Sequence, residues 1–192
     1  DFTREATDAD FDSAAYLLPR ADTSLLDRVE SPQVTGDTFG TIARAIENRQ
    51  VEDDILATCV GRINNRDALA QAADQLLAMK DISVAMVYGY RDGTVYVSAR
   101  SRHPDLDLGE ALRVAFDPIG SAGGHADMAG AQLPLGILKE VEVDDDEALT
   151  TVVEEVIGGR FFETMEDLSI IRRRGRLLEE HEGEGEAGPE AS

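Results

Sequence analysis

The residues best suited to bind a ligand are concentrated in a glycine-dense segment from Gly120 to Gly130. Glycine lets the backbone approach a ligand closely and turn N–H groups toward an anion, and a histidine donates to a phosphate oxygen. Gly123, Gly124 and His125 are the residues of this segment that fit such a site. A glycine-rich loop with one histidine is also common as a tight turn with a structural histidine. The spacing alone leaves both interpretations open.

Ser98 and Arg100 form a second pair of candidates, on a predicted strand at Thr94–Ser101. Apolar and polar residues alternate along this segment, so both candidates share its polar face. Arginine has the forked donors that suit a phosphate, and we expect this face to border a groove. The alternative is that Arg100 pairs with a surface aspartate. Arg102 and His103 are weaker candidates, because they fall where the strand ends.

Strands and helices in the middle of the chain must position these residues. β-compatible runs predict strands at 55–60, 83–90 and 94–101, with a hairpin at Asp92-Gly93. Helical spacing of apolar residues predicts helices over 69–77, 108–116 and 146–157, the last ended by Gly158-Gly159. Residues 120–130 are predicted to form a loop and 131–138 an extended segment. Strands interleaved with helices predict an α/β fold, with a mixed β-sheet flanked by helices.

The two ends of the chain differ from this middle region. Residues 1–52 carry short helical patterns without an evident strand and are predicted to form a helical linker. Residues 53–165 are predicted to form the α/β domain. Residues 166–192 are predicted to be an acidic, disordered tail that contains the basic patch Arg172–Arg176.

Charge is the strongest signal in the composition. Asp and Glu number 39 against 18 Lys and Arg, which gives a net charge of −21, and Lys80 and Lys139 are the only lysines. This balance predicts a protein from an extreme halophile, and the alternative is an ordinary acidic domain with an acidic tail. Broad, non-specific nucleic-acid binding needs a basic field and is disfavoured. A phosphate site in this chain must therefore be local.

The remaining composition restricts the compartment and excludes some classes of protein. Cys59 is the only cysteine, so neither a disulfide framework nor a zinc finger is possible. No apolar run is long enough to cross a membrane. We expect a cytoplasmic protein without a membrane partner. Because the chain opens at Asp1 rather than at a methionine, we also expect it to be part of a longer protein.

The order of these motifs resembles the DHH-associated C-terminal domain. That domain accompanies the catalytic DHH domain in phosphoesterases such as RecJ-type exonucleases, nano-RNases and exopolyphosphatase-like proteins. The family's S-x-R-S strand corresponds to Ser98–Ser101, and its G-G-G-H-x-x-A-A-G loop corresponds to Ala122–Gly130. Three residues depart from the loop pattern: Ala122 replaces a glycine, Ala126 a proline and Met128 an alanine. The change to Met128 is expected to narrow or reshape a nucleotide pocket.

The resemblance implies a substrate-binding role rather than a catalytic one. It implies that Ser98, Arg100, Gly123, Gly124 and His125 bind a nucleotide, a short oligonucleotide or a terminal phosphate. No Asp-His-His triplet occurs in the chain, so no catalytic or metal-binding residue is predicted here. Manganese or magnesium is expected in a separate N-terminal DHH domain, which would be the protein partner. No oligomeric state is predicted.

Two other roles are compatible with the same residues. One is a non-catalytic regulatory module that binds a nucleotide through the same motifs. The other is an interaction module that recruits a partner through Arg172–Arg176 and the acidic tail.

Overall fold

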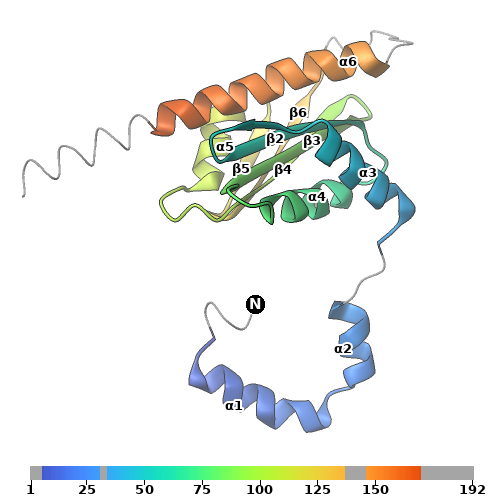
Figure 1. The fold of residues 1–192 in the computed structure, drawn as a ribbon, viewed down its shortest axis with the longest axis vertical. Helices are drawn as coiled ribbons and strands as arrows, with labels where there is room; N and C mark the ends of the chain where they lie inside the picture. The colour runs from blue at the N-terminus through green and yellow to red at the C-terminus, as the bar shows by residue number, and fades with distance from the viewer. Residues whose placement is uncertain (1–5, 31–33, 137–145, 170–192) are drawn as a thin grey trace, which may run out of the picture. The chain divides into compact units, whose positions relative to one another are not determined.

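The computed structural model describes residues 6–30, 34–136 and 146–169, and the chain divides into two compact units, 1–35 and 36–192. The first unit contains α1 (Asp8–Leu17), the 3₁₀ turn η1 (Leu18–Arg20) and α2 (Thr23–Glu30) (Figure 1). None of its described side chains is buried, and Phe11 and Tyr16 are more than half exposed. The predicted helical N-terminal segment is confirmed.

A six-stranded mixed sheet forms the centre of the second unit, which confirms the predicted α/β fold. Its strands, in spatial order, are β1 (Gln50–Glu52), β2 (Ile55–Arg62), β3 (Val84–Arg91), β4 (Thr94–Ser101), β6 (Met128–Pro134) and β5 (Ser121–Gly124). Only β2 and β3 run parallel. The predicted Asp92-Gly93 turn joins β3 to β4, and both residues adopt the positive φ that such a turn requires.

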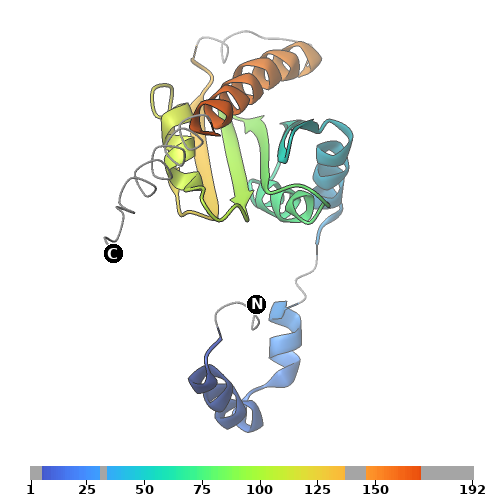
Figure 2. The same cartoon turned by 60° about the vertical axis from the view of Figure 1, so that its left-hand side comes forward.

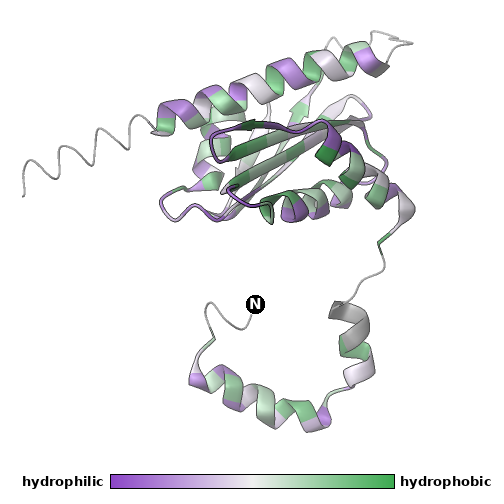
Figure 3. Ribbon diagram, in the orientation of Figure 1, coloured by the Kyte–Doolittle hydropathy of each residue, from purple (hydrophilic) through white to green (hydrophobic). Residues whose placement is uncertain are grey.

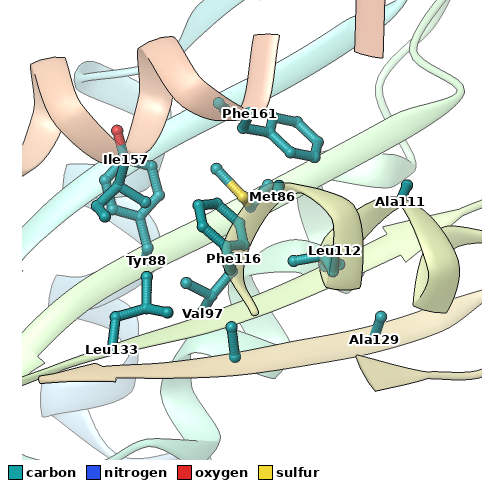
Figure 4. Packing of buried hydrophobic residues seen from close by; sticks show 14 of the residues in the cluster. Met86, Tyr88, Val97, Ala111, Leu112, Phe116, Ala129, Leu133, Ile157 and Phe161 are labelled. Atoms are coloured by element: carbon teal, nitrogen blue, oxygen red, sulfur yellow. The ribbon is translucent and has the colours of Figure 1, made fainter. Parts of the chain in front are cut away.

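Helices cover both faces of the sheet (Figure 2). α3 (Gly36–Glu47) and α4 (Asp67–Leu77) lie on one face, and α5 (Leu108–Phe116) and the C-terminal helix that begins with α6 (Asp146–Val153) lie on the other. Apolar residues are concentrated in the strands and on the inner sides of these helices (Figure 3). Figure 4 shows Ile157 and Phe161 of the C-terminal helix packed over Met86 and Tyr88 of β3. No described helix combines the length and hydrophobicity that a membrane span requires.

The C-terminal helix continues through the glycine pair that was predicted to end it, so that prediction is wrong. After α6 a π-helical turn, η3 (Glu154–Gly158), leads into a further α-helical segment over residues 159–169. The Tyr88 hydroxyl donates to the carbonyl oxygen of Glu154 at 3.2 Å. A Cβ atom at position 158 would lie 2.7 Å from that hydroxyl oxygen. Gly158 therefore permits close approach of the helix to Tyr88.

The prediction of a loop over residues 120–130 is also wrong. Residues 121–124 and 128–130 belong to the antiparallel strands β5 and β6, and only a short turn separates them. The predicted extended segment 131–138 continues β6 to Pro134, and its residues 137 and 138 lie outside the described part of the chain.

The compact unit begins before the predicted domain start at residue 53. α3 packs on the sheet through the fully buried Ala45, and β1 is a strand where none was expected. At the other end, residues 166–169 are helical rather than part of a tail. Residues 170–192, including Arg172–Arg176, lie outside the described residues.

Candidate functional site

A groove of about 450 Å³ lies on the face of the sheet that α4 covers. One wall is the beginning of α4, and the rest is formed by β4, β6 and the edge strand β5. The lining residues are Arg66, Asp67, Leu69, Tyr96, Val97, Ser98, Ser121, Ala122, Gly123, Gly130, Ala131 and Gln132. Two of the predicted site residues, Ser98 and Gly123, are among them.

A row of three small residues forms the floor of this groove. Ser98 lies opposite Gly130, which in turn lies opposite Gly123, so the row crosses β4, β6 and β5. Directly opposite residues of a sheet share a face, and no side chain larger than serine rises from this row. A Cβ atom at position 123 would find only Arg113 Nη1 nearby, at 3.4 Å. Arg113 belongs to α5 on the opposite face of the sheet, and on the groove face the row Ser98–Gly130–Gly123 carries no large side chain.

A second row, formed by Tyr96, Gln132 and Ser121, lies beside the floor on the same face. The guanidinium carbon of Arg66, just before α4, lies 5.2 Å from the centre of the Tyr96 ring. None of Tyr96, Arg66 and Gln132 was among the site residues predicted from the sequence. Only Tyr96 could have been predicted, because the alternating pattern of β4 places it on the same face as Ser98 and Arg100.

Arg100 is two residues beyond Ser98 on β4, so it lies on the side of the floor away from Tyr96. Three contacts hold its side chain. Its Nε is 2.6 Å from Asp74 Oδ1 on α4, and its Nη1 donates to Ser98 Oγ at 3.3 Å and to the Ala99 carbonyl at 3.0 Å. The Arg100 side chain is only 16% exposed. Pairing with an aspartate, the alternative interpretation of Arg100, is thus present in the structure. The pair adjoins the groove through Ser98.

Gly124 serves the packing of the β5–β6 hairpin and does not line the groove. A Cβ atom at this position would collide with the Met128 carbonyl oxygen. The hairpin also contacts the start of α5, because a Cβ atom on Gly109 would lie 2.6 Å from the Gly124 carbonyl oxygen. Only glycine fits at either position without a backbone shift.

His125 follows Gly124 in the hairpin turn, beside a third cross-strand row that is formed by Arg100 and Met128. Arg100 lies opposite Met128, and the His125 N–H donates to the Met128 carbonyl at 2.7 Å. The His125 carbonyl accepts from the Gly109 N–H at 3.0 Å. Its backbone is thus fully engaged, whereas the residue is exposed and is not among those that line the groove.

Two backbone N–H groups that flank the glycine pair already donate within the protein and are not free to bind an anion. The Ala122 N–H already donates to Asp117 Oδ1 at 3.2 Å, and the His125 N–H to Met128. Side chains rather than a nest of N–H groups therefore supply most polar groups near the groove. Within the described part of the chain, no group of three or more His, Cys, Asp or Glu residues is arranged to hold a metal ion.

The fold defines an α/β domain with a groove on one face of its sheet, and comparison with known proteins identifies its family. Residues 52–158 match the DHHA1 domain model, which covers more than half of the chain. The chain belongs to the DHHA1 domain family, and the predicted resemblance is confirmed.

Two known proteins are similar to this chain over most of its length. An uncharacterised protein of Methanocaldococcus jannaschii is 41% identical over 165 residues, which are 85% of this chain and 33% of that protein. This chain therefore spans a third of its relative. The crystal structure of an exopolyphosphatase-related protein from Bacteroides fragilis matches 83% of this chain and 46% of its own, with a TM-score of 0.53 and 13% identity. At that identity the likeness shows the fold.

Proposed function

We propose that this domain binds the phosphorylated end of a nucleotide or short oligonucleotide on behalf of a metal-dependent phosphoesterase. In this proposal the chemistry belongs to a separate DHH domain, and the DHHA1 domain holds the substrate. Membership of the DHHA1 family supports the assignment, together with the Ser98–Ser101 and Ala122–Gly130 motifs.

The observation that carries the proposal is the position of Arg100 beside a floor without large side chains. Among the described residues, the contacts of Arg100 occupy Nε and Nη1 and leave Nη2 for a ligand. An arginine fixed in this way loses little conformational freedom when it binds a phosphate. Ser98 adds a hydroxyl at the same place.

The charge of the chain favours a small ligand over a long one. Tracking a long nucleic-acid backbone requires many basic contacts, and the net charge here is −21. One fixed arginine beside a compact groove instead fits a single terminal phosphate.

The metal of the proposed phosphoesterase has no place among the described residues, because they offer no group of metal ligands. We therefore assign manganese or magnesium to the DHH domain, where such an ion activates water. The residues of this chain would bind and orient the substrate, with Arg100, Ser98 and Gly123 on the groove side and His125 at the hairpin turn.

Binding of adenosine 5′-monophosphate to the full chain, measured by calorimetry, tests the proposal. Arg100→Ala is expected to cost about 1–3 kcal/mol of binding, the range for a charge-assisted hydrogen bond. Arg102→Ala is the matched control, because Arg102 has the same charge two residues away but donates to the Met79 carbonyl rather than to Ser98 of the groove floor. Equal affinity in the wild type and Arg100→Ala, or equal losses in both variants, would contradict the proposal.

A further inference from the structure

The two ends of the groove differ in chemistry, and we infer that the end formed by Tyr96, Arg66 and Gln132 binds a nucleobase. The inference rests on the proposed function, because it divides one groove between the phosphate and the base of the same ligand.

The flat surface at this end is suited to stacking. Tyr96 is half-buried on the groove face of β4, with the Arg66 guanidinium over its ring, and Leu69 of α4 lines the same end. Aromatic rings and guanidinium planes are the surfaces on which proteins stack bases. A phosphate gains nothing from the negative face of a tyrosine ring.

Gln132 supplies an edge-reading group beside that surface. It lies directly opposite Tyr96, is exposed, and lines the groove. A primary amide carries both donors and an acceptor, and it pairs well with the hydrogen-bonding edge of adenine. The stacking surface and the polar edge therefore occur in one cross-strand row.

Aromatic surface rather than net charge distinguishes the two ends. Arg66 and Asp67 both line the groove at the Tyr96 end, and Arg100 is paired with Asp74 at the other side of the small-residue floor. Of these residues only Tyr96 offers an aromatic face, and only Arg100 is held against the floor through Ser98. The base is therefore placed at the Tyr96 end and the phosphate at Arg100.

The spacing of Tyr96 and Arg100 along β4 matches this division. Tyr96 and Arg100 are four residues apart on β4, which corresponds to about 13 Å along a strand. Between them lies the row Ser98–Gly130–Gly123, where the lack of large side chains leaves room for a sugar. A single nucleotide spans the distance with its phosphate at Arg100 and its base on Tyr96.

The test compares a ligand that has a base with one that lacks it. Binding of adenosine 5′-monophosphate and of ribose 5-phosphate is measured on the full chain and on Tyr96→Ala, Tyr96→Phe, Gln132→Ala and Arg100→Ala. We expect the wild type to prefer the nucleotide. Tyr96→Ala should lower the affinity for the nucleotide about tenfold and leave ribose 5-phosphate unchanged. Tyr96→Phe keeps the ring and should bind like the wild type.

Gln132→Ala keeps the test decisive if Tyr96→Ala does not fold, because Gln132 is exposed. It should also weaken binding of the nucleotide alone. A wild type that binds both ligands equally, or Tyr96 and Gln132 variants that retain the full preference for the nucleotide, would overturn the inference. Failure of the proposed function has a different signature, since Arg100→Ala would then leave both ligands unaffected.

Discussion

Asp74 on α4 pairs with Arg100 on β4, with Asp74 Oδ1 2.6 Å from Arg100 Nε. The Arg100 side chain is 16% exposed and that of Asp74 is 56% exposed, so the carboxylate is the hydrated member of the pair. Asp74 fixes the guanidinium in position and also neutralises much of its charge. A phosphate at Arg100 must therefore bind in the presence of a competing carboxylate.

Asp74→Asn should strengthen phosphate binding several-fold. The amide oxygen still accepts a hydrogen bond from Arg100 but no longer competes as an anion. Stability should change by less than about 1 kcal/mol, because pairs with an exposed partner contribute little. Calorimetry with adenosine 5′-monophosphate measures the effect. Asp92→Asn is the control, since it removes the partner of Arg91 outside the groove. An unchanged or weaker affinity in Asp74→Asn alone would contradict this role.

Gly124→Ala should lower the stability of the chain, whereas His125→Ala should lower its affinity for the nucleotide. A methyl group at position 124 collides with the Met128 carbonyl, so Gly124→Ala should lower the free energy of unfolding by about 1–3 kcal/mol. His125→Ala preserves the backbone hydrogen bonds of the turn and should unfold like the wild type. Under the proposed function it should nevertheless bind the nucleotide more weakly. A clear drop in the melting temperature of His125→Ala would instead make the histidine a support of the turn.

Gly158 and Gly159 are adjacent, yet alanine should act differently at each. At position 159 the helical backbone has open space around it, so Gly159→Ala should stabilise the chain by about 0.5–1 kcal/mol. Alanine at position 158 would displace the Tyr88 hydroxyl from Glu154 and should destabilise. Urea unfolding of both variants measures the difference. Equal effects at the two positions would show that the close approach to Tyr88 is unimportant.

The net charge of −21 predicts that salt stabilises the fold. Carboxylates repel one another at low ionic strength, and dissolved ions screen that repulsion. The melting temperature, followed by circular dichroism, should rise by several degrees from low to molar KCl. The halophile interpretation predicts this rise, and a flat or falling melting temperature would count against it.

Stability should fall at alkaline pH because of a buried thiol. Burial raises the pKa of Cys59 from 9.0 to about 11, so the folded chain keeps a proton that the unfolded chain releases. The contribution is constant below pH 9 and decreases above it, by about 1 kcal/mol per pH unit. The pKa of Tyr88 is raised in the same way by burial, but its effect begins near pH 10. Cys59→Ala should therefore show a shallower decline between pH 9 and 10.

The sequence predicted those elements whose pattern is local. β4 was recognisable from its alternation, and the β3–β4 hairpin from Asp92-Gly93. The β5–β6 hairpin was missed because glycines are typical of loops, whereas here Gly123 and Gly130 face each other across two strands. That pairing depends on register, which local composition does not reveal.

The candidate site was predicted only in part for the same reason. Ser98 and Gly123 were selected from their motifs, and the structure places them in one row of the groove floor. Arg66 and Gln132 are 66 positions apart in the sequence, and only the packing of α4 beside the sheet brings both to one groove. The ion pair of Arg100 with Asp74 also depends on this packing.

The π-helical turn at Glu154–Gly158 has a consequence for the comparison of relatives. Such a turn accommodates one residue more than an α-helical turn, and each residue of an α-helix advances by about 100°. A relative with a regular helix here would match both Val153 and Phe161, which flank the turn and are buried, to inward positions only if its alignment carried a one-residue gap. Without that gap, the final helical stretch of the two proteins would be compared a quarter-turn out of phase. A relative that lacks one residue between positions 154 and 158 is thus expected to lack the π-helical turn and the contact that it makes with Tyr88.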